Sequence, residues 1–135
     1  MKNIFKSSLV ALAVITSNIS FANDISADFL NNEAEIAHKV YLHESTEVAI
    51  YAMESIVRLQ ESDQSDKLLQ KTGPSSLSFS YIRLGFLYEK SGLMQKADIA
   101  FSKAVATYKS PYNKNESVAL SKLKRAVQEL DAISS

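Results

Sequence analysis

The chain has 135 residues, of which 46% are hydrophobic, and its 15 basic residues balance its 15 acidic residues. It contains no cysteine, which excludes disulfides, thiolate metal sites and thiol catalysis. Basic and aromatic residues do not alternate in any cluster, so we expect no nucleic-acid partner.

The first 22 residues have the three-part pattern of a cleavable secretory signal peptide. Lys2 and Lys6 supply a positive start, and residues 9–15 are uninterruptedly apolar. Ser20 and Ala22 then place small residues at the two positions that signal peptidase reads. The pattern predicts cleavage after residue 22.

The predicted cleavage leaves a mature chain of residues 23–135, a length typical of a single domain. The apolar run of the leader is too short to span a bilayer, which takes about 20 residues, so we expect no membrane insertion after cleavage. An uncleaved N-terminal anchor is the alternative. The leader looks bacterial and carries no lipid-attachment cysteine, which indicates the periplasm, with secretion as the alternative.

Charge is distributed unevenly along the mature chain. Residues 23–66 hold ten acids and two bases, a net charge of −8, whereas residues 67–135 hold five acids and eleven bases, a net charge of +6. Two solvated surfaces within one fold explain this pattern. A charged pole for a partner, or head-to-tail self-association into a homo-oligomer, is the alternative.

The acidic half predicts two helices, because no glycine or proline occurs between Ile25 and Thr72 and apolar residues recur at three-to-four spacing. Ser26 is expected to cap the first helix, and Ser45 or Thr46 the second. The expected buried stripe of the first helix comprises Phe29, Ile36, Ala37, Val40 and Tyr41. The expected buried face of the second comprises Val48, Tyr51, Ala52, Ile56 and Leu59, widened by Ile50, Met53 and Val57.

The basic half predicts three more helices. After the stop signal at Gly73-Pro74, a helix capped by Ser75 or Ser76 runs to about Lys90, and a tight turn over 91–93 leads into a helix over 93–108. A capping helix over 115–133, begun by Asn115, completes the chain. No segment alternates as a strand would. The expected fold is therefore all-α, with about five helices in antiparallel hairpins that form a single domain over 23–135.

The segment 78–111 resembles one tetratricopeptide repeat (TPR). The first helix of that repeat expects a large residue, a Leu-Gly pair and a tyrosine, and the second expects small, aromatic and small residues around a small-residue turn. The matching positions are Tyr81, Leu84, Gly85, Tyr88, Gly92, Ala97, Phe101 and Ala104. An ordinary helical hairpin with the same small residues is the alternative.

A single repeat cannot bury its own faces, so the resemblance implies that flanking helices complete a short superhelix. The helices over residues 26–59 are the candidate for a degenerate upstream repeat. In this family, ligands usually lie on the concave surface that the first helix of each repeat lines. The resemblance therefore implies a candidate partner-binding face of Phe79, Ile82, Phe86 and Glu89. The alternative is that another helix of the same chain covers these mostly apolar residues.

The sequence contains no constellation that indicates catalysis, a cofactor or a metal. His38 and His43 are five residues apart, whereas two zinc ligands on one helix are typically four apart. No phosphate-binding glycine loop or serine nucleophile elbow is present.

Together these features predict a non-enzymatic, periplasmic protein–protein interaction module of TPR type, with another protein as its partner. The alternative is an immunity protein that neutralises a toxin effector in the periplasm, such as one delivered by type VI secretion. In that case the acidic half would bind a basic enzyme cleft.

Overall fold

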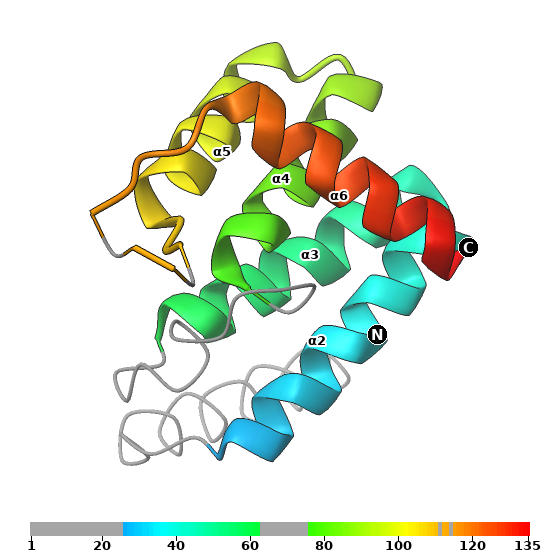
Figure 1. Ribbon diagram of the computed structural model, residues 1–135. Coiled ribbons are helices and arrows are strands. Elements are labelled where there is room, and N and C mark those ends of the chain that lie inside the picture. The colour runs from blue at the N-terminus through cyan, green and yellow to red at the C-terminus, as the bar shows by residue number, and fades with distance from the viewer. Residues whose placement is uncertain (1–25, 63–75, 111, 114) are drawn as a thin grey trace, which may run out of the picture.

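The computed structural model describes residues 26–62, 76–110, 112–113 and 115–135, so the predicted leader and the Gly73-Pro74 stop lie outside the described residues. The described residues form five α-helices and no strand, which confirms the all-α prediction. The helices (Figure 1) are α2 (Ala27–His43), α3 (Thr46–Glu61), α4 (Leu77–Lys90), α5 (Met94–Thr107) and α6 (Leu120–Ser134).

Serine side chains begin the first three of these helices. The hydroxyls of Ser26, Ser45 and Ser76 each accept a hydrogen bond from the amide three residues later, at 3.2, 3.5 and 3.2 Å. Each bond satisfies one of the amide donors that a helix leaves unpaired at its start. The predicted caps at Ser26 and Ser45 are confirmed, and Ser76 rather than Ser75 caps α4.

The helices α4 and α5 form a tightly packed antiparallel hairpin. Gly92 makes the turn between them with φ of 74°, a left-handed conformation that glycine adopts at little cost. Gly85 on α4 faces the ring of Phe101 on α5, and a methyl group at position 85 would lie only 2.6 Å from Cδ1 of that ring. Ala97 and Ala104 are fully buried beside it. Gly85 therefore allows the two helices to approach closely.

The buried faces of α2 and α3 differ from the expected ones. The residues that α2 buries are Leu30, Ala34 and Ala37, and those that α3 buries are Ala49, Met53, Ile56, Val57 and Gln60. Phe29, Ile36 and Val48 are about half exposed, and Tyr51 is 72% exposed. The predicted stripes were wrong at these positions because periodicity locates an apolar face but not its partner. The alanines of both helices lie inward, leaving larger apolar residues outside.

The last helix begins at Leu120, five residues later than the predicted start at Asn115. The hydroxyl of Ser110 accepts hydrogen bonds from the amides of Tyr112 and Asn113, both at 3.3 Å, and also bonds the carboxylate of Glu116 at 3.1 Å. These contacts hold the preceding segment in a turn. No side chain caps α6, so the predicted role of Asn115 was wrong.

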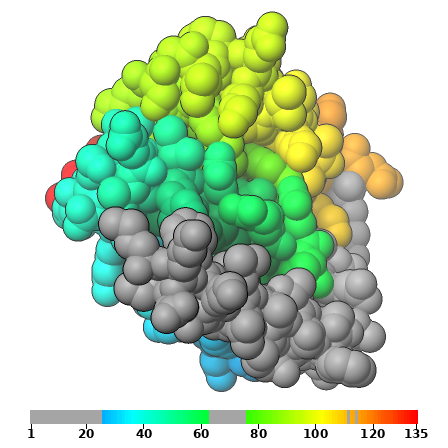
Figure 2. Space-filling view, turned by 180° about the vertical axis from the view of Figure 1, so that it is seen from behind, coloured from blue at the N-terminus to red at the C-terminus, as the bar shows by residue number. Residues whose placement is uncertain are grey.

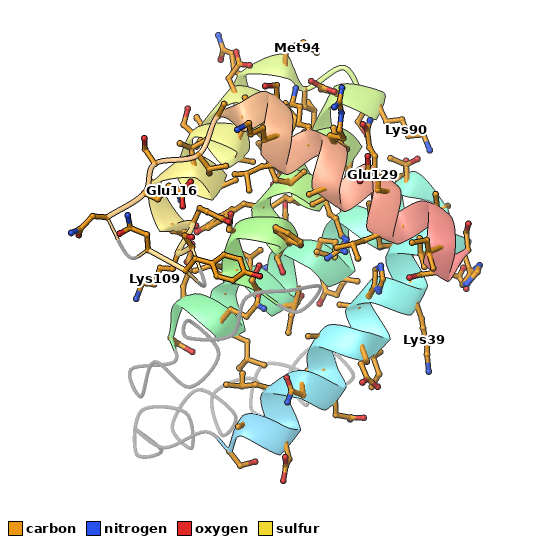
Figure 3. The ribbon with its side chains drawn as sticks, in the orientation of Figure 1. Lys39, Lys90, Met94, Lys109, Glu116 and Glu129 are labelled. Atoms are coloured by element: carbon orange, nitrogen blue, oxygen red, sulfur yellow. The ribbon has the colours of Figure 1, made fainter. Side chains whose placement is uncertain are left out.

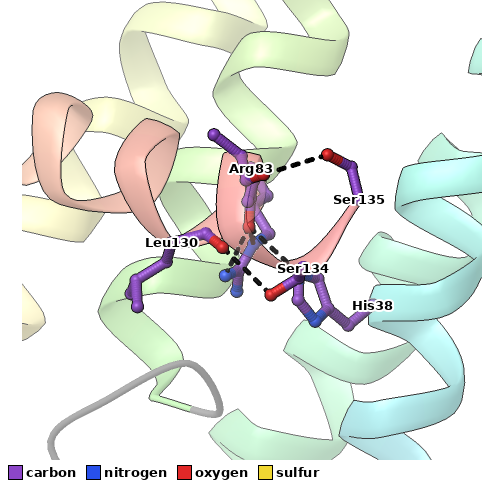
Figure 4. Close-up of polar contacts among 7 residues, drawn as sticks. His38, Arg83, Leu130, Ser134 and Ser135 are labelled. Carbon is purple, nitrogen blue, oxygen red and sulfur yellow. Dashed lines mark hydrogen bonds and ion pairs between the residues drawn. The ribbon is translucent and has the colours of Figure 1, made fainter.

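Helix α6 crosses the α4–α5 hairpin and reaches α2 at its far end (Figure 1). Leu123 and Val127 anchor it in the core. Near its end, Asp131 accepts a hydrogen bond from Arg83 on α4 at 2.9 Å and contacts His38 on α2 at 3.0 Å (Figure 4). One carboxylate therefore ties three helices together.

The environment of the Arg83–Asp131 pair stabilises the charged form of the Asp131 carboxylate. Arg83 is only 1% exposed, and its guanidinium lies 6.0 Å from the ring centroid of Tyr41. Burial tends to raise the pKa of Asp131, but the bonds from His38 and Arg83 outweigh it and hold that pKa below its ordinary value of 3.8. Burial and the nearby carboxylate of Asp131 raise the pKa of Tyr41 to about 12.

Replacement of Gly85 by alanine is expected to destabilise the fold by about 1–3 kcal/mol, because the added methyl group overlaps the ring of Phe101. Chemical denaturation measures the change. The Gly85→Ala/Phe101→Leu double variant should lose less stability than the two single variants combined, because the smaller side chain relieves the overlap. Strict additivity would contradict the close contact.

Replacement of Asp131 by asparagine is expected to cost about 3 kcal/mol at neutral pH, because it removes the carboxylate that forms an ion pair with the buried guanidinium of Arg83. The carboxylate has a lower pKa folded than unfolded, so its contribution is present above pH 3.8 and is lost as the pH falls through the lower folded value. Urea denaturation at pH 7 and at about pH 3 should show a smaller acid-induced loss for Asp131→Asn than for the wild type. Equal losses would contradict this assignment.

Candidate protein-binding groove

The face predicted to bind a partner is covered by α6. Phe79 is 9% exposed and Ile82 is fully buried. Phe86 and Glu89 are partly buried, with the ammonium of Lys124 5.9 Å from the ring centroid of Phe86 and 3.6 Å from a carboxylate oxygen of Glu89. The expectation of an open apolar groove on this face was therefore wrong. Helix α6 folds back over the apolar side chains and takes the place of a partner.

Three basic residues follow one another closely on α6, but only one of them packs inward. The ammonium of Lys124 lies 3.9 Å from the ring centroid of Phe101, while the side chains of Lys122 and Arg125 are exposed. The charge of Lys124 is thus positioned over aromatic rings of the α4–α5 hairpin.

The residues that carry the repeat resemblance occupy the interior of the α4–α5 hairpin. All are buried except Gly92, which lies at the turn. Two of them, Tyr81 and Tyr88, extend away from α6 toward α3, where their hydroxyls bond glutamates. They therefore link the hairpin to its neighbour.

The side of the hairpin away from α6 carries an accessible groove of about 280 Å³. Figure 2 shows this face of the molecule, hollowed where α3 meets α4 and α5. Val57, Leu84 and Ala100 contribute apolar surface, and Ile99, which is 58% exposed, lies at its edge. Charged side chains from α3 line one side of the groove, and charged side chains from α5 line the other. We call this surface the α3–α5 groove.

One set of three side chains crosses the groove near the turn between α4 and α5. The hydroxyl of Tyr88 donates a hydrogen bond to Glu54 on α3 at 2.6 Å. On the opposite side of the groove, the ammonium of Lys96 on α5 lies 5.6 Å from the centroid of the Tyr88 ring. Burial, and then the bond to Glu54 and its negative charge, raise the pKa of Tyr88, so its hydroxyl stays a neutral donor at physiological pH.

A second set repeats the first, two helical turns away. The hydroxyl of Tyr81 donates to Glu61, and the ammonium of Lys103 lies 5.6 Å from the centroid of the Tyr81 ring. Each residue is seven positions from its counterpart, so the sets lie roughly 10.5 Å apart along their helices. We call the two sets the two-rung ladder.

The ladder leaves its two lysines available to a partner. Across the described ranges, Lys96 and Lys103 form no ion pair, and both are exposed. Each is held over an aromatic ring by a cation–π contact, a geometry worth about 0.5–1 kcal/mol at an exposed site. The groove thus presents two positive charges at a regular spacing beside an apolar floor.

A second, acidic surface lies between α2 and α3, where a groove of about 300 Å³ is lined by Glu33, Ile36, Tyr51 and neighbouring residues. The α2–α3 hairpin, over residues 26–62, carries seven acids and two bases, a net charge of −5. The acidic half of the sequence therefore supplies the α2–α3 surface, and its residues Glu54 and Glu61 also line the α3–α5 groove opposite Lys96 and Lys103.

Within the described part of the chain, no group of three or more His, Cys, Asp or Glu side chains could hold a metal ion. His38 is partly buried and lies against Asp131, whereas His43 is exposed. None of the helices in the described ranges is both long and apolar enough to cross a membrane.

Comparison of the chain with protein-family models, with curated proteins and with solved structures gives no match. The groove must therefore be interpreted from its own geometry.

Replacement of Tyr88 by phenylalanine is expected to lower stability by about 1 kcal/mol, because it removes the hydroxyl that bonds Glu54. The matched control is Tyr51→Phe, since Tyr51 is 72% exposed and its hydroxyl forms no hydrogen bond within the described residues. Thermal or urea denaturation measures the stability of both variants. Equal stability of both variants would contradict a structural role for the ladder.

Proposed function

We propose that this chain is a non-enzymatic protein–protein interaction module of TPR type, which acts in the periplasm after export. The observation that carries the proposal is the two-rung ladder of the α3–α5 groove. It places Lys96 and Lys103, which form no ion pair with any described residue, beside an apolar floor on a face that α6 leaves open.

The chemistry of the groove favours a segment with two carboxylates and apolar side chains. On a helix, carboxylates seven residues apart lie roughly 10.5 Å apart, which matches the spacing of Lys96 and Lys103. On an extended strand, carboxylates three residues apart lie at a similar distance but point to opposite faces, so a strand cannot present both to the two lysines. Because apolar contact and charge would act together, recognition corresponds to docking of a helix in a groove.

Export rests on the sequence of the predicted leader, residues 1–22, with secretion as the alternative destination. Subcellular fractionation and N-terminal sequencing of the mature protein test it directly. A chain recovered intact at Met1 from the cytosol would overturn the periplasmic assignment.

The acidic α2–α3 hairpin favours a second function, that of an immunity protein that neutralises a toxin in the periplasm. Ile36 and Tyr51 are exposed on it beside Glu33, and its net charge over residues 26–62 is −5. Such a surface complements a basic enzyme cleft, and charge of this kind accelerates association. A neighbouring gene for a secreted toxin would favour this function over the first.

A designed peptide series tests the groove. A helical peptide with glutamates seven residues apart and leucines between them should bind at least tenfold more tightly than the same composition with glutamates five residues apart, because only the first matches the ladder. Fluorescence anisotropy measures both dissociation constants.

The Lys96→Glu/Lys103→Glu variant should lose this preference. The Lys90→Glu/Lys109→Glu variant is the matched control, since both side chains point away from the molecule (Figure 3) and neither lines the groove. Equal binding of the matched and mismatched peptides to the wild type would overturn the assignment of the groove.

A further inference from the structure

The outer face of α2 repeats a short motif that complements the α3–α5 groove. An acidic residue followed by a large apolar residue occurs twice, as Asp28-Phe29 and Glu35-Ile36, seven positions apart. All four side chains are exposed, although Phe29 and Ile36 are apolar. The motif therefore has the same two-turn period as the ladder.

The position of this motif on the helix makes it available to another molecule. The inward face of α2 is defined by Leu30, Ala34 and Ala37. Residues seven apart on a helix share one column, and adjacent residues lie about 100° apart. One column thus carries the two acids and the neighbouring column the two apolar side chains, both on the outside.

The two surfaces match in charge, spacing and apolar content. The acids of α2 and the lysines of α5 are both spaced roughly 10.5 Å apart. The exposed ring of Phe29 and the exposed aliphatic chain of Ile36 are apolar, as are the floor of the groove and the exposed Ile99. Because α2 packs on α3 through its inward face, its outer face cannot reach the groove of its own chain.

We infer that the occupant of the α3–α5 groove is α2 of a second copy of this chain. The inference rests on the groove being a protein-binding site, as proposed above. Asp28 and Glu35 of one copy pair with Lys96 and Lys103 of the next, and Phe29 and Ile36 of the first cover the groove floor of the second. The surfaces in contact differ, so the interface is head-to-tail and builds a ring or an open chain of copies.

Sedimentation equilibrium of the purified protein over a hundredfold concentration range tests this arrangement. At low salt the average mass should rise with concentration. At 1 M salt, where the screening length falls to about 3 Å, association should weaken at least tenfold. A wild type that stays monomeric throughout would overturn the inference.

Charge-reversal variants test whether the α3–α5 groove and the outer face of α2 are the two surfaces in contact. Lys96→Glu/Lys103→Glu and Asp28→Lys/Glu35→Lys should each abolish association, whereas the control Lys90→Glu/Lys109→Glu should leave it unchanged. Mixing the two reversed variants should restore assembly, because the basic α2 of one then meets the acidic groove of the other. Circular dichroism verifies that every variant retains its helices. Failure of the mixture to assemble, with folded variants, would overturn the pairing.

The peptide assay separates this inference from the proposed function. If the matched peptide binds the groove but Asp28→Lys/Glu35→Lys associates like the wild type, α2 is not the occupant, and the groove remains a binding site for another protein. If the peptide does not bind and the wild type is monomeric, both the proposed binding function of the groove and the inference about α2 are wrong.

Discussion

The guanidinium of Arg83 lies almost entirely out of water, in the middle of a chain that has no disulfide to hold it together. A charge in that position is stable only with a partner, and Asp131 supplies one from the far end of the chain. The same carboxylate contacts His38, so α2, α4 and α6 meet at a single acid (Figure 4). The path of α6 across the hairpin depends on this contact, together with the burial of Leu123 and Val127.

The position of α6 decides which surfaces remain open. By lying over Phe79, Ile82 and Phe86 it removes the inner face of the hairpin from solvent. A terminal helix that folds back over a helical hairpin reduces the exposure of its apolar face. Among the described residues, accessible grooves remain between α2 and α3, between α3 and α5, and between Phe79, Tyr108 and the start of α6.

The two-rung ladder links local packing to function. Tyr81 and Tyr88 match positions at which a tetratricopeptide repeat places large residues, yet their hydroxyls bond glutamates of the preceding helix and their rings lie beneath lysines of the following one. The contacts that set the register of α3, α4 and α5 therefore also space the charges of the groove. The same side chains therefore stabilise the packing of the three helices and supply the charges of the proposed binding groove.

The sequence alone determined the helices, the caps at Ser26 and Ser45, the turn at Gly92 and the close approach at Gly85, because each depends on contacts within a few residues or on one pattern within a hairpin. The seven-residue spacing of the ladder was also visible there, although nothing local showed that three helices would align it. Only the tertiary structure decided how far Ile82, Phe29 and His38 are exposed to solvent. The exposure of each depends on which distant helix packs against it, and that choice follows from long-range contacts such as Arg83 with Asp131.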